Sequence, residues 1–185
     1  LKFKEFYPKK HFKKSLYWLF IESKVLRDAK GVFFTSEEEK SLAPLSFSPY
    51  RCNSIVTSLG AELPPIENKD ALERFFVKYP EVRGKRVVLF LGRIHQVKGC
   101  DILVQAFAKT IQNIQNTQNI HLVIAGPDQY GLVDGLKEMS NQLGVSDKIT
   151  WTGMLSGEMK WAAFYAAEVL ILPSHQESFG IAVAE

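Results

Sequence analysis

The chain has 185 residues, of which 46% are hydrophobic and 23% charged, and its formal net charge is +3. At about 150 residues per domain this length allows one sizeable core but not two complete domains, and an aromatic content of 12% excludes a disordered or fibrous chain. No apolar run reaches the roughly 18 residues of a membrane span, and no apolar signal segment follows the first lysines. We therefore expect a cytoplasmic globular protein.

The positive charge is concentrated at the start of the chain. Residues 1–14 contain six lysines and one acid and carry +5, so the remainder carries −2. Phe3, Phe6, Tyr7 and Phe12 stand among these lysines. The segment therefore has two interpretations: contact with an anionic membrane surface or a lipid-linked acceptor, or a solvated basic segment.

The first sixty residues combine helix and strand signals. Apolar residues at helical spacing predict a helix over residues 11–29, and a short strand, Val32–Thr35, follows it. Ser36, with Glu39 three residues later, predicts a capping box at the start of another helix.

Turn-forming residues near position 60 predict a domain boundary. A second short apolar run, Ser54–Ser58, ends in Gly60 and the Pro64-Pro65 pair. Glycine and paired prolines interrupt regular structure, so the expected division lies at Gly60.

Helices and apolar strands alternate regularly from residue 69 onward. The expected helices and strands are helices 69–79, 99–112, 131–143 and 158–167, and strands Arg86–Leu91, Ile120–Ala125, Lys148–Thr152 and Glu168–Leu172. Within the first two strands, the runs Val87–Leu91 and Leu122–Ala125 are apolar on both faces, which is typical of central strands covered on two sides. The alternation predicts an α/β fold with a doubly wound parallel sheet.

The loops that follow the strands form the expected ligand edge of this sheet. They all contain glycine beside polar or charged residues: Gly92–Gly99, Gly126–Gly131, Gly153–Gly157 and Pro173–Gly180. In the first loop, Arg93 and Lys98 flank the start of a helix, whose free N–H groups attract anions. A phosphate or diphosphate is the predicted ligand. A helix that opens near Phe179 and Gly180 would add a second anion site.

Several common cofactor motifs are missing. No two glycines are two residues apart, which excludes the dinucleotide fingerprint, and Leu132 stands where a P-loop requires lysine.

Cys52 and Cys100 lack metal-ligand spacing and are expected to be reduced thiols. Glu177 and Glu185, eight residues apart, would be separated by about 12 Å along a helix, too far for a glycosidase carboxylate pair.

Four motifs at the strand ends carry a family resemblance. They are Gly92-Arg93 with Lys98-Gly99-Cys100-Asp101, Ala125-Gly126-Pro127, Thr152-Gly153, and Pro173-Ser174 with Glu177-Ser178-Phe179-Gly180 and Glu185. Together they resemble the donor domain of the retaining glycosyltransferases of family 4 (glycosyl transferase group 1), which have the Rossmann-like GT-B fold. The resemblance covers nearly all of residues 30–185. It implies that residues 1–59 are a remnant of the acceptor domain and that residues 60–185 are a truncated donor-binding domain.

The resemblance implies that Arg93 and Lys98 bind the donor diphosphate. There they would stabilise the charge that develops on the leaving nucleoside diphosphate. Gly92 would let the backbone approach the donor closely. With Glu177, these two cations are the predicted catalytic residues.

The resemblance also implies contacts to the remainder of the donor. Glu177 would hold hydroxyls of the hexose, and Glu185 would receive the hydroxyls of the ribose. The backbone N–H groups of Phe179 and Gly180 would cradle a phosphate.

The resemblance implies an enzyme that moves a hexose from a UDP-, GDP- or ADP-linked donor with retention of configuration. We expect the full-length protein to have this activity and the 185-residue fragment to lack it on its own. No metal or other cofactor is expected, because the family is generally metal-independent and the chain has no Asp-x-Asp pair. The acceptor is left open between a lipid-linked molecule and a saccharide, and no nucleic acid is expected. The alternative is a non-catalytic module that only binds the nucleotide sugar. A phosphorylase of the same fold would need a pyridoxal phosphate lysine motif, which is not visible.

Overall fold

A computed structural model describes residues 11–57, 60, 64–113, 119–175, 177 and 180–184. The chain divides into two compact units, Leu1–Ala61 and Glu62–Glu185. Most of the basic segment, residues 1–10, lies outside the described residues. Within the described ranges, no helix is long and apolar enough to cross a membrane.

The first unit contains a bipartite helix and a small parallel sheet. Its elements are α2 (His11–Tyr17), the π-helical turn η2 (Trp18–Glu22), α3 (Ser23–Asp28), β1 (Val32–Phe34), α4 (Glu37–Leu42), the 3-10 turn η3 (Ala43–Leu45) and β2 (Ser54–Val56). The predicted helix over residues 11–29 is therefore present, with one π-helical turn in its middle. β1 pairs in parallel with β2. Trp18 is buried and stacks on Phe47 and Tyr50.

Ser36 caps α4 as predicted, but the predicted capping box is only half formed. The Ser36 hydroxyl accepts a hydrogen bond from the Glu39 N–H at 3.0 Å. The Glu39 carboxylate accepts from the hydroxyl and the N–H of Thr35, both at 2.7 Å. The Thr35 hydroxyl and then its N–H lower the pKa of Glu39. Glu39 thus ties α4 to the end of β1, because Thr35 offers it two donors.

The second unit is a four-stranded parallel sheet with helices on both faces. Its elements are α5 (Lys69–Lys78), η4 (Pro80–Val82), β3 (Arg86–Leu91), η5 (Gln96–Lys98), α6 (Cys100–Asn113), β4 (Ile120–Ala125), α7 (Val133–Gln142), η7 (Ser146–Lys148), β5 (Ile149–Gly153), α8 (Gly157–Ala166), β6 (Ala167–Leu170) and α9 (Ile181–Ala184). The strand order is β5-β4-β3-β6, and every pair is parallel. The predicted doubly wound α/β fold is confirmed, with bounds that agree to within two residues for the elements from α5 to β6.

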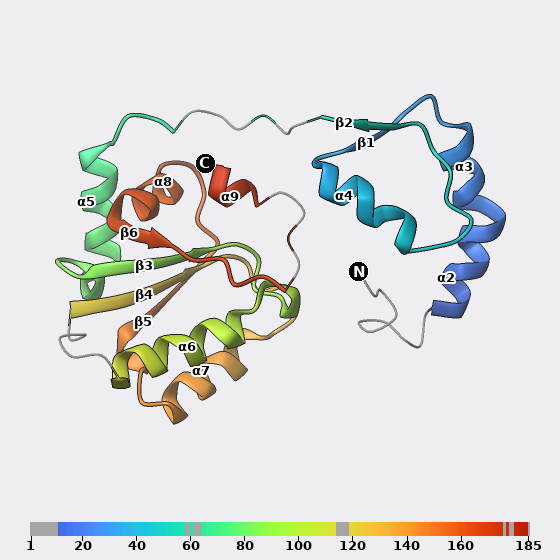
Figure 1. The fold of residues 1–185 in the computed structure, drawn as a ribbon. Coiled ribbons are helices and arrows are strands. Elements are labelled where there is room, and N and C mark those ends of the chain that lie inside the picture. Colours follow the sequence, from blue (N-terminus) through green and yellow to red (C-terminus); the bar gives the residue numbers. More distant parts are fainter. Residues whose placement is uncertain are drawn as a thin grey trace. The chain divides into compact units, whose positions relative to one another are not determined.

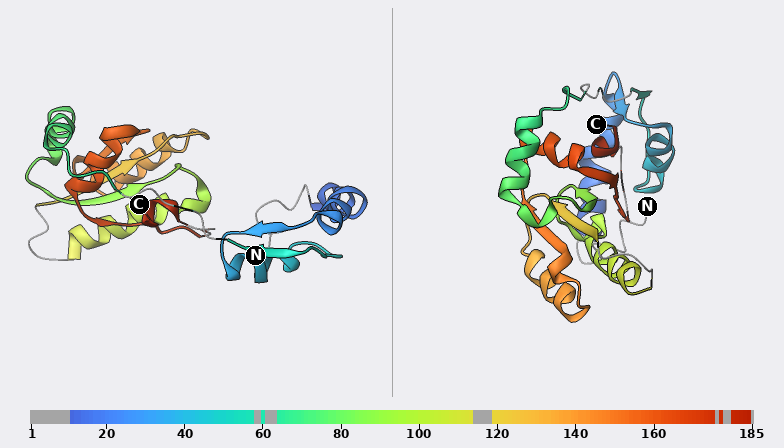
Figure 2. Two further views of the ribbon diagram at one scale, coloured as in Figure 1. Left: turned by 90° about the horizontal axis from the view of Figure 1, so that it is seen from above. Right: turned by 90° about the vertical axis from the view of Figure 1, so that its left-hand side faces the viewer.

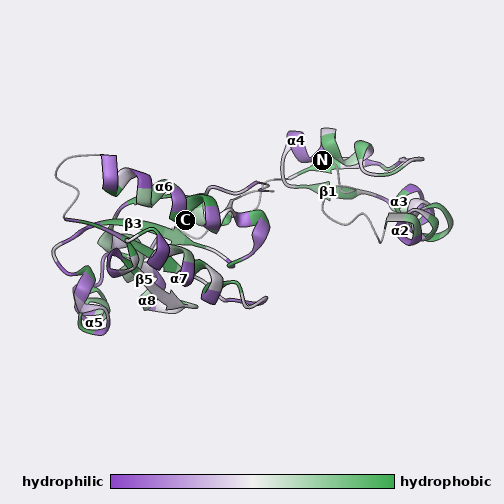
Figure 3. Cartoon of the chain, turned by 90° about the horizontal axis from the view of Figure 1, so that it is seen from below, coloured by the Kyte–Doolittle hydropathy of each residue, from purple (hydrophilic) through white to green (hydrophobic). Residues whose placement is uncertain are grey.

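Two apolar cores lie on opposite faces of this sheet. Phe90 and Ile124 pack in the core beneath α6 and α7, whereas Leu89 and Val123 pack in the core beneath α5 and α8. Figure 1 shows these two pairs of helices on opposite sides of the strands, and Figure 2 gives two further views of the same layers. Successive residues of β3 and β4 enter opposite cores, so both strands are apolar except at Arg86 and His121, and β3 is coloured mainly as hydrophobic in Figure 3.

The two cysteines are free thiols in different surroundings, and we expect them to differ in reactivity. Cys100 begins α6 and is 3% exposed, and burial raises the pKa of its thiol to about 11. Cys52 is half-buried, with its Sγ 3.2 Å from Ser54 Oγ. Because the thiolate is the nucleophile, Ellman's reagent should modify Cys52 at least about tenfold faster than Cys100. Assays of Cys52→Ser and Cys100→Ser variants assign the two rates, and equal native rates would contradict the burial of Cys100.

Candidate functional site

The strand order of the second unit's sheet changes direction at β3. From β3 the chain proceeds outward to β4 and β5, and it then returns to β6 on the other side of β3. The carboxyl ends of the parallel neighbours β3 and β6 therefore lie side by side at this point. Open α/β sheets bind ligands at such a point, outside the carboxyl ends of the strands. Both loops that carry the predicted site residues lie here.

An ion pair joins these two loops. Lys98 Nζ donates to Glu177 Oε2 at 2.6 Å, although the residues are 79 positions apart. The Ser174 hydroxyl donates to the same oxygen at 3.2 Å. The side chains of Lys98 and Glu177 are 18% and 35% exposed. The structure thus brings a predicted phosphate ligand and a predicted sugar ligand into direct contact.

Glu177 is held in its ionised form. Partial burial opposes its charge, but Lys98, the Ser174 hydroxyl and the Gly180 N–H together outweigh this effect, so the pKa of the carboxyl lies below its usual value. A carboxylate in this state only accepts hydrogen bonds. It suits hydroxyl ligands better than it suits proton donation.

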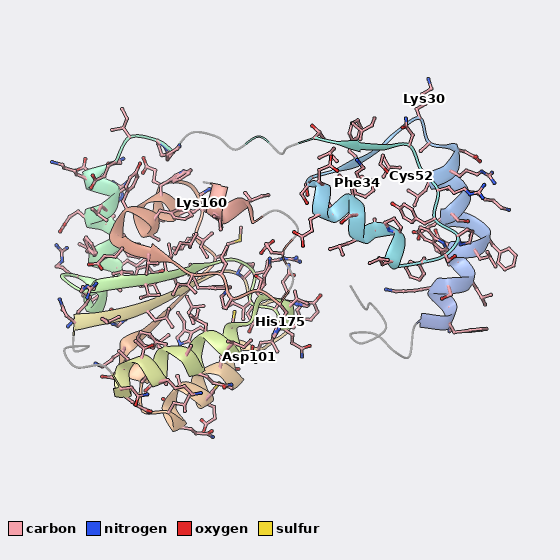
Figure 4. The ribbon with its side chains drawn as sticks, in the orientation of Figure 1. Lys30, Phe34, Cys52, Asp101, Lys160 and His175 are labelled. Carbon is pink, nitrogen blue, oxygen red and sulfur yellow. The ribbon has the colours of Figure 1, made fainter. Side chains whose placement is uncertain are left out.

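Backbone contacts hold the two loops together beside the ion pair. The His175 N–H donates to the Val97 carbonyl at 2.9 Å. Gly99 has a φ of 64°, and a Cβ there would lie 2.2 Å from the Pro173 carbonyl oxygen. His175 and Asp101, in the first turn of α6, lie at this same end of the unit (Figure 4). Only glycine at position 99 permits this approach, a role that the sequence analysis missed.

A second close backbone approach lies where β3 and β4 end. Gly92 N–H donates to the Ala125 carbonyl at 2.9 Å, and Gly126 N–H donates to the Gly153 carbonyl at 2.8 Å. A Cβ on Gly126 would lie 1.7 Å from the Gly92 oxygen, whereas a Cβ on Gly92 would meet only the Phe90 ring, at 3.6 Å. Gly126 therefore requires glycine for packing. The predicted approach of Gly92 to a donor stays a prediction.

The remaining predicted residues have different placements. Arg93 directly follows Gly92 and its side chain is exposed; no ion pair joins it to another described residue. Gly180 is buried, has a φ of 71° and precedes α9, so the predicted helix start is confirmed. Its N–H donates to the Glu177 carboxylate. Phe179 and Glu185 lie outside the described residues.

A chain of polar side chains, buried at His121 and Thr150 and exposed at Glu81, lies at the opposite end of the strands. His121 Nε2 is 2.9 Å from Thr150 Oγ1, which donates to Glu81 Oε1 at 2.6 Å. Burial lowers the pKa of His121. The chain satisfies polar groups inside the fold, away from the ligand edge. Across the described ranges, no group of three or more His, Cys, Asp or Glu side chains could hold a metal ion.

Comparison with known proteins places this site in a family context. Residues 72–185, more than half of the chain, match the family described as glycosyl transferases group 1. A D-inositol 3-phosphate glycosyltransferase of Nocardia farcinica is 33% identical over 104 residues, which are 55% of this chain and 23% of that protein. An uncharacterized glycosyltransferase of Methanocaldococcus jannaschii is 33% identical over 101 residues, which are 55% of this chain and 24% of that protein.

A solved structure shares the fold. The Anabaena protein Alr3699/HepE, in complex with UDP and glucose, matches with a TM-score of 0.74 at 17% identity, over 89% of this chain and 44% of that one. At this identity the likeness shows the fold alone. The chain spans less than half the length of these three proteins.

Proposed function

The chain belongs to the group 1 glycosyltransferases, a family with the GT-B fold, and we propose that its second unit binds the nucleoside diphosphate of a sugar donor. The observation that carries this proposal is the Lys98–Glu177 ion pair. It joins a cation and an acid from the loops after β3 and β6, where the strand order reverses and where such sheets bind their ligands.

Arg93 and Lys98 supply the positive charge for the diphosphate in this proposal. The Lys98 ammonium has three N–H donors, so it can bind a phosphate oxygen while it keeps Glu177. The exposed Arg93 guanidinium offers a bidentate fork. α6 begins two residues after Lys98, and its first N–H groups and dipole add to the attraction for an anion. The UDP in the Anabaena complex supports this choice of ligand.

Glu177 orients the sugar in the same proposal. Its ionised carboxylate accepts hydrogen bonds from hexose hydroxyls, and Gly92 borders the donor. The Phe179 N–H cradles a phosphate, and the Gly180 N–H joins it by exchanging the Glu177 carboxylate for a phosphate oxygen. Glu185 receives the ribose hydroxyls. During transfer, Arg93 and Lys98 stabilise the negative charge that leaves with the diphosphate. We propose transfer of a hexose with retention, from a UDP-, GDP- or ADP-linked donor, without a metal or other cofactor.

The two units have different roles in this proposal. Residues 60–185 bind the donor, and residues 1–59 belong to the part that binds the acceptor. A second candidate is a module that binds the donor without transferring the sugar.

Calorimetric titration of UDP, GDP and ADP and of their glucose conjugates tests the donor site. We expect at least one of them to bind at or below millimolar concentration. An Arg93→Ala, Lys98→Ala double variant should bind at least about tenfold more weakly, because a hydrogen bond to a charged group contributes about 1.5–3 kcal/mol.

The matched control is a Lys109→Ala, Lys137→Ala double variant, which removes the same charge from exposed positions on α6 and α7. It should bind like the wild type. Failure of every nucleotide to bind the wild type, or equal binding by the Arg93 and Lys98 variant, would refute the donor site. An assay of sugar transfer and of donor hydrolysis by this chain then separates an enzyme from a binding module.

A further inference from the structure

His95 organises the turn that presents Lys98. It caps the 3-10 turn Gln96–Lys98, and its Nδ1 accepts a hydrogen bond from the Val97 N–H at 3.1 Å. Its carbonyl accepts the Lys98 N–H at 2.9 Å. An acceptor role for Nδ1 requires that this nitrogen carries no proton.

Val97 is held at both of its backbone polar groups. The His95 imidazole accepts its N–H, and its carbonyl accepts the His175 N–H from the loop after β6 at 2.9 Å. The next residue is Lys98, and Gly99 after it is fixed by its approach to Pro173. The backbone on both sides of Lys98 is therefore restrained. Among these restraints, the hydrogen bond to the His95 imidazole is the one that a side chain provides.

Two contacts orient His95 itself. Its ring meets the ring of Tyr130, from the loop after β4, edge to face at a centroid distance of 4.9 Å and an interplanar angle of 78°. Its backbone N–H faces the thiol of Cys100, the buried first residue of α6, where it acts against the rise in pKa that burial causes. The imidazole thus enters the turn from a fixed position.

We propose that His95 is a positioning residue for the donor site: its Nδ1 holds the Gln96–Lys98 turn so that the Lys98 ammonium meets Glu177 and the donor diphosphate. The role toward the diphosphate rests on the proposed function, whereas the role toward Glu177 rests on the geometry alone. Loss of the Nδ1 acceptor leaves the Val97 N–H without its partner and frees the turn, so Lys98 spends less time at Glu177.

Two substitutions distinguish the effect of the His95 Nδ1 acceptor from the effect of the aromatic ring. His95→Asn keeps an acceptor atom on Cγ, where the imidazole has Nδ1, and asparagine is a favoured capping residue. His95→Phe keeps a ring for Tyr130 but has no acceptor. In calorimetric titrations with UDP, we expect His95→Asn to bind within about twofold of the wild type and His95→Phe to bind about fivefold more weakly, the usual effect of losing a cap. His95→Ser and His95→Ala repeat the comparison without a ring, in case the phenylalanine variant fails to fold.

Combination with Lys98→Ala separates positioning from general stability. If His95 acts through Lys98, His95→Phe should cause no further loss of UDP affinity in the Lys98→Ala background. An equal loss in both backgrounds would overturn the proposal.

A measurement without ligand distinguishes this proposal from the donor site itself. Carbon NMR of the Glu177 carboxyl should give a lowered pKa in the wild type and in His95→Asn, and a pKa closer to the usual glutamate value in His95→Phe. If UDP fails to bind the wild type while Glu177 responds in this way, the donor site is wrong and the positioning role stands. If Glu177 titrates alike in all variants, His95 does not position Lys98.

Discussion

Replacement of Gly126 with alanine is expected to lower the free energy of unfolding of the second unit by about 3 kcal/mol or more. The new Cβ would lie 1.7 Å from the Gly92 carbonyl oxygen and 2.7 Å from its carbon, and the φ of 156° is one that only glycine adopts readily. Both neighbours are backbone atoms. No rotation of a side chain relieves the overlap, so the ends of β3 and β4 must separate.

That separation would also reach the donor site. The Gly92 N–H pairs with the Ala125 carbonyl on one side of the overlap, and the Gly126 N–H pairs with the Gly153 carbonyl on the other. The backbone nitrogen of Arg93 would lie 3.4 Å from the new Cβ. We therefore expect the variant to lose nucleotide binding together with stability.

Amide hydrogen exchange in β4 measures this effect, because the central strand of a core exchanges only when the unit unfolds. Gly135→Ala is the matched control: it lies within α7, where a Cβ would meet no atom within 4 Å. It should stabilise the unit by roughly 0.5–1 kcal/mol, because alanine loses less backbone freedom than glycine. Exchange in the Gly126→Ala variant at the wild-type rate would contradict the close packing of these strand ends.

The regular elements of the second unit could be predicted because their signals are local. β3 and β4 contain the apolar runs Val87–Leu91 and Leu122–Ala125, and the observed strand bounds coincide with the predicted ones, Arg86–Leu91 and Ile120–Ala125. β6 was predicted to reach Leu172 but ends at Leu170. Ile171 and Leu172 still pack against the core beneath α6 and α7. The apolar pattern therefore continues for two residues beyond the end of the strand.

The sequence predicted which residues form the site but not the contacts between them. Lys98 and Glu177 belong to motifs, but their contact depends on the return of the chain to the far side of β3, which no local pattern records. Histidine is not among the favoured capping residues, so nothing in the sequence signalled the bond from Val97 to His95. The clash that excludes a side chain at Gly126 likewise arises from the ends of two paired strands.

Replacement of Glu177 with glutamine is expected to have opposite effects on two ligands. The carboxylate now shares Lys98 and would repel a nearby phosphate, so its neutral replacement should strengthen the binding of UDP severalfold. A sugar conjugate of UDP instead loses a charged acceptor for its hydroxyls, an interaction of about 1.5–3 kcal/mol. The ratio of the affinity for UDP-glucose to the affinity for UDP should therefore fall at least about tenfold.

Paired calorimetric titrations of UDP and UDP-glucose give this ratio directly, and GDP or ADP pairs replace them if those nucleotides bind. Glu67→Gln makes the same change of charge at an exposed position before α5 and should leave both affinities unchanged. A Glu177→Gln variant with an unchanged ratio would show that this carboxylate does not bind the sugar.

The same substitution should also change how the stability of the second unit depends on pH. The pKa of Glu177 is lowered in the folded chain, so its ionised form stabilises the fold above the usual pKa of glutamate, and this contribution is lost as the pH falls through the folded value. Glutamine resembles the protonated acid. The wild type should therefore exceed Glu177→Gln in stability near neutral pH and match it in acid, whereas a difference that is independent of pH would mean that the Lys98–Glu177 pair does not hold this carboxylate in its ionised form.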